Sequence, residues 1–182
     1  MTIALVLIDL QNDYFPEGAM ELVESTAAVA QAAALLQAAR ARGRPVFHIQ
    51  HLSTRAGATF FLPDTRGAQI HEAVAPRAGE SVVVKHYPNA FRETVLLERL
   101  RAGAITSLAF AGMMTHMCVD TSVRAAADLG FECHLAHDAC ATRALSFGGR
   151  TVAAPDVQAA YLAGLGGAFA RVQTARDVAA SL

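Results

Sequence analysis

The chain has 182 residues, of which 15 are Lys or Arg and 16 are Asp or Glu. This length allows a sizeable core and lies within the range of a single domain, so we expect one domain over residues 1–182. Because the charges balance, the composition excludes a strong attraction to nucleic acid or to a membrane surface, and we expect neither as a partner.

Short apolar runs alternate with helix-like segments along the chain. The predicted strands are, in chain order, residues 3–8, 45–50, 81–84, 107–112, 132–137 and 170–175. The predicted helices are residues 25–43, 93–101, 118–130 and 154–165. The segment 52–79 is long and rich in Gly and Pro, which indicates an irregular cover over the strand ends. Such alternation is typical of an α/β protein, so we expect a three-layer fold with a mostly parallel six-stranded sheet and helices on both faces.

The N-terminal apolar run and the cysteines bear on the compartment. Residues 3–8 carry no basic leader and are followed by Asp9, so they predict neither a signal peptide nor a membrane span. The three cysteines, Cys118, Cys133 and Cys140, have no CxxC spacing, which favours a reducing cytoplasm over a disulfide framework. We therefore expect a cytoplasmic protein.

Three chemically active side chains stand at or shortly after the ends of predicted strands. Asp9 follows the first strand, Lys85 follows the third, and Cys118 comes after residues 107–112 and opens a helix. Ligands of open parallel sheets bind beyond the carboxyl ends of the strands, so these three residues are expected to meet there. With Thr115 as the N-cap, Cys118 would sit among unpaired N–H groups, which predicts a lowered thiol pKa.

These residues belong to three longer motifs. They are Leu7-Ile-Asp9-Leu-Gln-Asn-Asp13-Tyr-Phe, Val-Lys85 followed by Asn89-Ala-Phe91, and Ala111-Gly-Met-Met-Thr115-His-Met-Cys118-Val. Together they resemble the isochorismatase-like cysteine hydrolase superfamily, whose members include nicotinamidases and N-carbamoylsarcosine amidases. The resemblance implies a catalytic triad of Asp9, Lys85 and Cys118 on a sheet of order 3-2-1-4-5-6.

The resemblance also implies a mechanism of amide hydrolysis. Asp9 would accept the thiol proton, Lys85 would stabilise both anions, and the Cys118 thiolate would attack a carbonyl. The Gly112 to Thr115 turn would carry a cis peptide between Met113 and Met114, and the backbone N–H groups of Met114 and Cys118 would form the oxyanion hole. A thioester would follow, which water hydrolyses with Asp9 as the base.

A metal site is predicted to be absent. In nicotinamidases of this superfamily a divalent ion is held by an Asp-x-His pair after the second strand and by a later His. Here the region reads Phe47-His48-Ile-Gln-His51 without the aspartate, and His48 and His51 would point to opposite faces of a strand. We therefore expect a metal-independent enzyme without any cofactor, and not a nicotinamidase.

The substrate is expected to be a small molecule. Phe15, Phe60, Phe61 and Tyr87 could form an apolar wall, or could simply pack in the core and loops. Thr115 belongs to the same candidate substrate site, and His116, next to the nucleophile, could orient a substrate or be an exposed turn residue. The Ala-rich helices could pack on the sheet or on another subunit, and we expect a homo-oligomer, a dimer or tetramer.

Alternative functions remain open from the sequence. Cys118 could act with His137 and Asp138, or with His86, as a Cys-His-Asp hydrolase. An isochorismatase-type vinyl-ether hydrolase is a second alternative, although the resemblance implies that such enzymes do not use the cysteine. A non-catalytic small-molecule binding protein is a third, while a thiol-disulfide oxidoreductase is disfavoured because no resolving cysteine lies nearby in sequence.

Overall fold

The computed structural model describes residues 2–182 and contains a parallel sheet of six strands. In spatial order the strands are β3 (Ser81–Lys85), β2 (Val46–His51), β1 (Ile3–Ile8), β4 (Ser107–Met113), β5 (Glu132–Ala141) and β8 (Arg171–Gln173). The predicted order is therefore confirmed, with β8 as the sixth strand. Every residue of β1 and β4 is buried, as expected for central strands covered on both faces.

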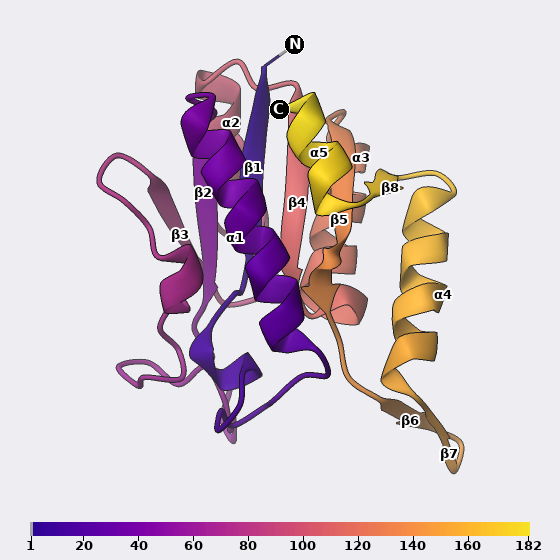
Figure 1. Ribbon diagram of the computed structural model, residues 1–182. Helices are drawn as coiled ribbons and strands as arrows, with labels where there is room; N and C mark the ends of the chain where they lie inside the picture. Colours follow the sequence, from indigo (N-terminus) through magenta and orange to yellow (C-terminus); the bar gives the residue numbers. More distant parts are fainter. Residues whose placement is uncertain (1) are drawn as a thin grey trace.

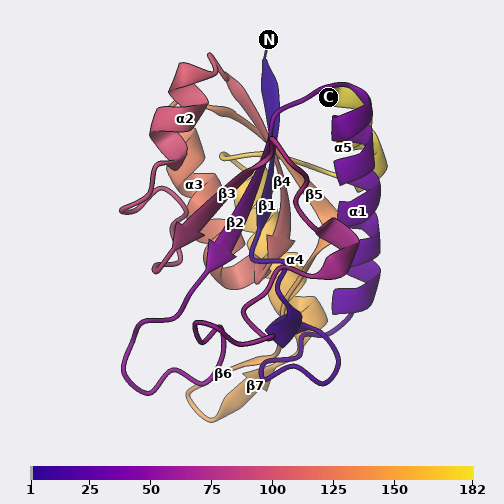
Figure 2. The same ribbon diagram turned by 90° about the vertical axis from the view of Figure 1, so that its left-hand side faces the viewer.

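Helices cover both faces of this sheet, which confirms the three-layer fold. Figure 2 shows α1 (Ser25–Ala41) and α5 (Ala175–Ser181) on one side and α2 (Leu96–Ala102) and α3 (Asp120–Asp128) on the other. In Figure 1, α4 (Ala154–Gly166) stands beyond the β8 edge of the sheet. Alternate residues of β1 point to opposite faces of the sheet and pack against different helices. One face carries Ile3, Leu5 and Leu7, which pack toward α1. The other face carries Ala4, Val6 and Ile8, which pack toward α2 and α3.

Several element boundaries differ from the predictions. β5 continues to Ala141, past the predicted end at residue 137, because a register shift opposite Phe110 and Gly112 lets the strand keep pairing with β4. The predicted helix 118–130 is a π-helical turn, Thr115–Val119, followed by α3. The predicted helix 93–101 begins later, as α2 at Leu96.

Three short elements at the C-terminal end were not predicted. They are the antiparallel strands β6 (Leu145–Phe147) and β7 (Arg150–Val152), and α5, whose N-cap Thr174 accepts a hydrogen bond from the Asp177 N–H and so ends β8 before residue 175. All are seven residues or shorter, so they carry little periodic signal. No helix within residues 2–182 is long and apolar enough to span a membrane.

Candidate active site

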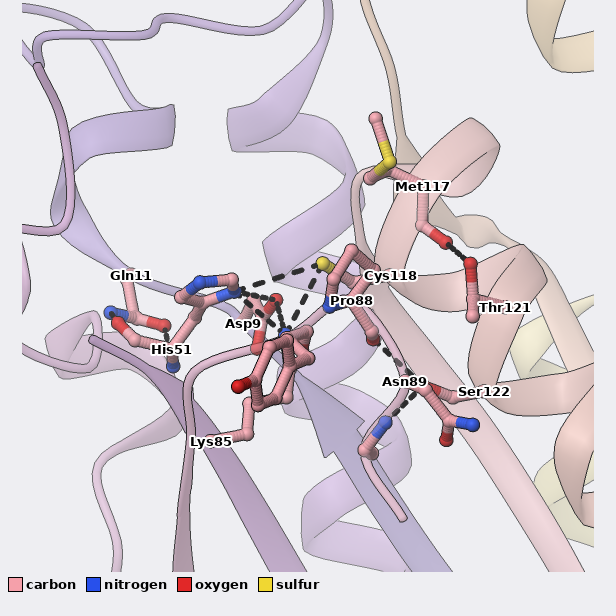
Figure 3. A network of polar contacts seen from close by, with 12 residues as sticks. Asp9, Gln11, His51, Lys85, Pro88, Asn89, Met117, Cys118, Thr121 and Ser122 are labelled. Atoms are coloured by element: carbon pink, nitrogen blue, oxygen red, sulfur yellow. Dashed lines mark hydrogen bonds and ion pairs between the residues drawn. The ribbon is translucent and has the colours of Figure 1, made fainter. Parts of the chain in front are cut away.

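The carboxyl ends of four neighbouring strands bring together a carboxylate, an ammonium group, an imidazole and a thiol. Asp9 follows β1, His51 ends β2, Lys85 ends β3, and Cys118 lies in the π-helical turn after β4. Because the strands are parallel, these ends share one edge of the sheet. Figure 3 shows the four side chains converging there.

Lys85 connects the other three groups. Its Nζ lies 2.8 Å from Asp9 Oδ2, 2.8 Å from His51 Nδ1 and 3.2 Å from Cys118 Sγ, and 3.1 Å from the Tyr87 carbonyl oxygen. His51 pairs with Lys85 in the β2–β3 register, so the lysine side chain leans across β2 to reach the ends of β1 and β4. The side chains of Lys85 and Asp9 are completely buried. An ammonium group has three N–H donors, so Lys85 cannot donate to all four neighbours at once.

Charge balance keeps this buried lysine protonated. Burial by itself would lower the pKa of Lys85, but the Asp9 carboxylate and the Cys118 sulfur outweigh it and raise the pKa above its usual range. Burial, together with the Lys85 charge, lowers the pKa of His51 to about 4, so this imidazole is neutral near pH 7. Its Nδ1 therefore accepts a hydrogen bond from Lys85, which places the imidazole proton on Nε2.

Asp9 retains the capacity to accept a proton. Its Oδ2 forms a short ion pair with Lys85, but within residues 2–182 neither carboxylate oxygen accepts a well-aligned hydrogen bond. The contact to Lys85 is thus close in distance and poor in angle. Asp9 also adopts a left-handed backbone conformation, with φ of 49°, and such residues cluster at functional sites.

The predicted lowering of the Cys118 pKa is wrong. Burial raises the pKa of this thiol well above its usual range, the Asp9 carboxylate adds to the rise, and Lys85 opposes it. Thr115 is not the N-cap: its hydroxyl donates to the Ala141 carbonyl oxygen at 3.2 Å, and the N-cap position belongs to Met114 without a side-chain cap. Cys118 therefore rests as a thiol and needs an acceptor such as Asp9 to become nucleophilic.

The turn before Cys118 has the predicted backbone. The Met113–Met114 peptide is cis, as the sequence motif implied. Gly112 has φ of 143°, and a Cβ at this position would collide with the backbone of Ile8 in β1. A glycine is therefore required at this position, where β4 leaves no room for a Cβ beside β1.

A cavity of about 610 Å³ opens above the thiol. Cys118, Met114 and Met117 form one part of its lining, and residues 53–55 and 57–60 of the predicted cover form another. Phe60 and Tyr87 line it, as predicted. Sequence reasoning did not assign four further lining side chains to a substrate site, namely Tyr14, His51, Arg55 and Arg143.

The other four predicted substrate residues do not line this cavity. Phe15 packs on His71, with ring centroids 4.1 Å apart. Phe61 is fully buried behind the wall, with its ring centroid 4.6 Å from that of Tyr14. Thr115 bonds to β5 as described, and His116 is buried with its Nδ1 2.5 Å from Thr142 Oγ1. Each of these side chains is committed to packing or to a hydrogen bond behind the cavity surface.

Two polar residues of the first motif hold the cover in place. Asp13 accepts a hydrogen bond from the Phe61 N–H at 2.6 Å, and Gln11 Nε2 donates to the Ala68 carbonyl oxygen at 2.7 Å and to that of His51 at 2.9 Å. Both side chains are buried. The spacing Asp9-x-Gln11-x-Asp13 thus combines one residue that points into the site with two that fix the loops around it.

The structure does not bring Cys118 together with His137 and Asp138, as the Cys-His-Asp alternative requires. His137 and Asp138 line a different cavity, of about 580 Å³, between α1, β5 and α4, where the neighbouring thiol is Cys140. Asp138 accepts a hydrogen bond from the Ala175 N–H at the start of α5. His86 lines the cavity of Cys118, but its Nδ1 lies 2.8 Å from the Leu52 carbonyl oxygen.

The site does not fit a metal ion, although its donor atoms are close enough. Ligand atoms of Asp9, His51 and Cys118 all lie within 4.8 Å of one another. The Lys85 ammonium contacts all three, however, and so holds the position that a cation would need. His48 points to the other face of β2, where its Nε2 lies 2.9 Å from Glu80 Oε2, as the spacing predicted.

Comparison with known proteins places this site in a family. The isochorismatase domain matches residues 3–177. The isochorismatase family protein YddQ of Bacillus subtilis is 45% identical, over 96% of this chain and 97% of that protein. The solved structure of an isochorismatase hydrolase from Oleispira antarctica is similar with a TM-score of 0.94 and 49% identity, over 98% of this chain and 96% of that one.

Relatives with named activities include amide hydrolases. Maleamate amidohydrolase of Pseudomonas putida is 34% identical, over 70% of this chain and 67% of that protein. Streptothricin hydrolase of Streptomyces noursei and nicotinamidase of Escherichia coli are further relatives. From the domain match and these identities, the chain belongs to the isochorismatase family of hydrolases.

Proposed function

We propose that the protein hydrolyses a C–N bond in a small amide or ureido compound, with Cys118 as the nucleophile, Asp9 as the acid and base, and Lys85 as the stabilising cation. The observation that carries this proposal is the fully buried ammonium of Lys85, which contacts both the Asp9 carboxylate and the Cys118 thiol below an open cavity. The amidohydrolases among the relatives support the same bond type.

The first step is attack on the carbonyl. The thiol proton passes to Asp9, whose oxygens lack well-aligned hydrogen-bond donors among the described residues, and the remaining thiolate is stabilised by Lys85. The sulfur forms a bond to the carbonyl carbon, and the carbonyl oxygen becomes an oxyanion. We assign its stabilisation to the backbone N–H groups of Met114 and Cys118, which belong to residues that line the cavity.

The second half of the reaction restores the enzyme. Protonated Asp9 gives its proton to the leaving nitrogen, the C–N bond breaks, and an acyl thioester remains on Cys118. A water molecule, deprotonated by Asp9, attacks the thioester and releases the carboxylic acid, and the thiol regains its proton. Lys85 stays protonated throughout, in agreement with its raised pKa.

The test is release of ammonia from a panel of amides and ureides by wild-type protein and by two cysteine variants. Cys118→Ala is expected to lose several orders of magnitude in turnover, because removing one member of a group that acts together removes most of the acceleration. Cys140→Ala is the matched control, since that buried thiol lines the other cavity, and it is expected to retain activity. Chelation is expected to leave the rate unchanged.

Two results would overturn the proposal. The first is hydrolysis by Cys118→Ala at the wild-type rate. The second is a complete absence of ammonia release from the panel, accompanied by turnover of a vinyl ether or by binding of a ligand alone, which would favour the vinyl-ether hydrolase or the binding protein.

A further inference from the structure

His51 is a titratable side chain in the site that the proposed reaction does not use. It ends β2, and its Nδ1 lies 2.8 Å from Lys85 Nζ, 3.8 Å from Asp9 Oδ2 and 4.0 Å from Cys118 Sγ. Figure 3 shows this ring nitrogen turned toward the three catalytic side chains. The imidazole also lines the cavity above the thiol, so it is placed to contact a reacting molecule.

The contact with Lys85 decides where the imidazole proton lies. An ammonium group only donates hydrogen bonds, so His51 Nδ1 accepts one from Lys85 and the proton of the neutral ring is on Nε2. Burial and the charge of Lys85 lower the pKa of His51 to about 4, which keeps the ring neutral near pH 7. His51 therefore offers one N–H donor, at Nε2.

This Nε2–H group faces the cavity. Within residues 2–182 the nitrogen has no hydrogen-bond partner, yet it is not one of the fully buried polar atoms of that part of the chain. The side chain keeps 15% of its surface exposed and lines the cavity above Cys118. A directed N–H group in a cavity wall binds an acceptor atom of a molecule that enters.

The ring of His51 is held in place by its surroundings. The side chain of Gln11 accepts a hydrogen bond from the His51 N–H at 2.7 Å and donates one to its carbonyl oxygen at 2.9 Å. The imidazole also packs near the buried ring of Phe61, with centroids 5.8 Å apart. A donor fixed in this way needs little reorganisation when the reaction takes place.

Hydrolysis of the acyl thioester requires a water molecule whose oxygen points at the acyl carbon. Asp9 can take a proton from this water, but one contact does not fix the direction of the lone pairs. An N–H donor supplies the second contact, because one lone pair accepts its hydrogen bond and the other stays free for the attack. His51 lies beside both Asp9 and Cys118 and can supply that donor.

We infer that the Nε2–H of His51 holds the water that hydrolyses the acyl thioester. This inference rests on the proposed function and adds the residue that positions its second nucleophile. The water donates a hydrogen bond to Asp9 and accepts one from His51. As the water oxygen bonds to the acyl carbon, its proton passes to Asp9, the C–S bond breaks, and the sulfur takes the proton back from Asp9. The imidazole keeps its own proton throughout.

The ester p-nitrophenyl acetate tests this inference, because it reports the two halves of the reaction separately. One equivalent is mixed with the enzyme, and the release of nitrophenolate gives the rate of acetylation. Mass spectrometry of the peptide that contains Cys118 then gives the rate at which the acetyl group is lost. Cys118→Ala is expected to carry no acetyl group on this peptide.

Two substitutions separate the roles of the two ring nitrogens of His51. In His51→Asn the amide lies near the position of Nδ1, so acetylation is expected to stay within about twofold of wild type, while deacetylation slows about tenfold for one lost hydrogen bond. In His51→Gln an amide N–H reaches the position of Nε2 and is expected to restore deacetylation to within about threefold. His51→Phe keeps the packing on Phe61 without either nitrogen and is expected to deacetylate as slowly as His51→Asn.

His137→Asn is the matched control. It makes the same substitution at a histidine that lines the other cavity, where only its backbone carbonyl accepts a hydrogen bond, from Gln158. Both steps are expected to keep their wild-type rates. Melting temperatures of all variants establish that each is folded, and His51→Phe takes the place of His51→Asn if the latter does not fold.

The outcomes separate the inference from the proposed function. Deacetylation of His51→Asn at the wild-type rate, or an equal slowing in His137→Asn, would overturn the inference and leave the proposed function standing. So would equal slowing of both steps, or a loss in His51→Gln that His51→Asn does not show, because each would mean that His51 acts through Lys85. A wild-type enzyme that never carries an acetyl group on Cys118 would overturn the proposed nucleophile and the inference together.

Discussion

Lys85 is the only lysine in the chain, since the other 14 basic residues are arginines. The environment of Lys85 explains why an arginine could not replace it at this position. Carboxylate, imidazole, thiol and backbone carbonyl surround one nitrogen at 2.8 to 3.2 Å, an arrangement that suits a compact point charge and not a planar fork. The residue whose positive charge offsets the Asp9 carboxylate is thus the one lysine of the sequence. A label that is selective for lysine therefore reports on this residue alone.

The first prediction concerns the charge of Lys85. Protein labelled with ¹⁵N at lysine Nζ is expected to give one side-chain signal, which stays in the charged form above pH 10.5 because the pKa is raised. In Asp9→Asn the carboxylate is lost, burial dominates, and the pKa is expected to fall below 10.5. An unchanged titration in that variant would show that Asp9 does not hold the lysine charge.

A second prediction concerns His51. Its pKa is lowered to about 4 by burial and by Lys85, so the folded state resists protonation that the unfolded chain accepts near pH 6.5. The associated stability is complete above pH 6.5 and is lost as the pH falls toward 4. Urea unfolding across this range is expected to show a shallower decline for His51→Gln than for wild type. The exposed His86→Gln serves as the control, and an equal flattening there would contradict the assignment.

At the scale of elements, the β4 turn is the part of the site that depends most on local backbone geometry. Gly112→Ala places a Cβ against the Ile8 backbone at φ of 143°, so we expect a large loss of stability and of activity together. Gly149→Ala, at φ of 75° with open space around the position, is the matched control and is expected to cost only about 1 kcal/mol. Similar melting temperatures for the two variants would show that the close approach of β4 to β1 is not required.

Long strands and helices were predictable because their periodic patterns are strong. The residues 3–8 and 107–112 are predicted as buried strands, and the structure buries every residue of β1 and β4.

Cys118 shows the limit of such patterns. Its place after a strand suggested a helix N-terminus and a lowered pKa, but the turn is π-helical and burial raises the pKa. Desolvation depends on distant segments of the chain, so it leaves no local signal.

At the scale of the whole molecule, the sheet order allowed three distant residues to be placed at one site from sequence alone. Asp9, Lys85 and Cys118 were predicted from strand ends and motifs, and the structure brings them together. Tyr14, His51 and Arg143 were missed as members of the site because they reach it from a short 3-10 helix, a strand end and a loop, whose paths only the folded chain defines. Apolar residues such as Phe15 and Phe61 were assigned to the cavity because a sequence does not distinguish packing behind a wall from exposure on it.

The expected homo-oligomer gives a prediction at this scale. Phe147, on the β6–β7 hairpin, exposes 91% of its surface, and Figure 1 shows this hairpin at the far end of α4 from the sheet. We expect a second copy of the chain to cover this aromatic side chain. Light scattering is expected to give a dimer or tetramer for wild type and a smaller species for Phe147→Ser with unchanged folding. A monomeric wild type would contradict the expectation.

The central claim, that Cys118 forms a covalent acyl intermediate, is tested most directly by mass spectrometry of enzyme quenched in acid during turnover of its best amide. The account predicts an added mass equal to the acyl group on the peptide that contains Cys118, absent from the peptides of Cys133 and Cys140. Burial raises the pKa of both of these other thiols to about 12, which leaves them unreactive near neutral pH. Turnover without any adduct on Cys118, together with full activity of Cys118→Ala, would contradict it.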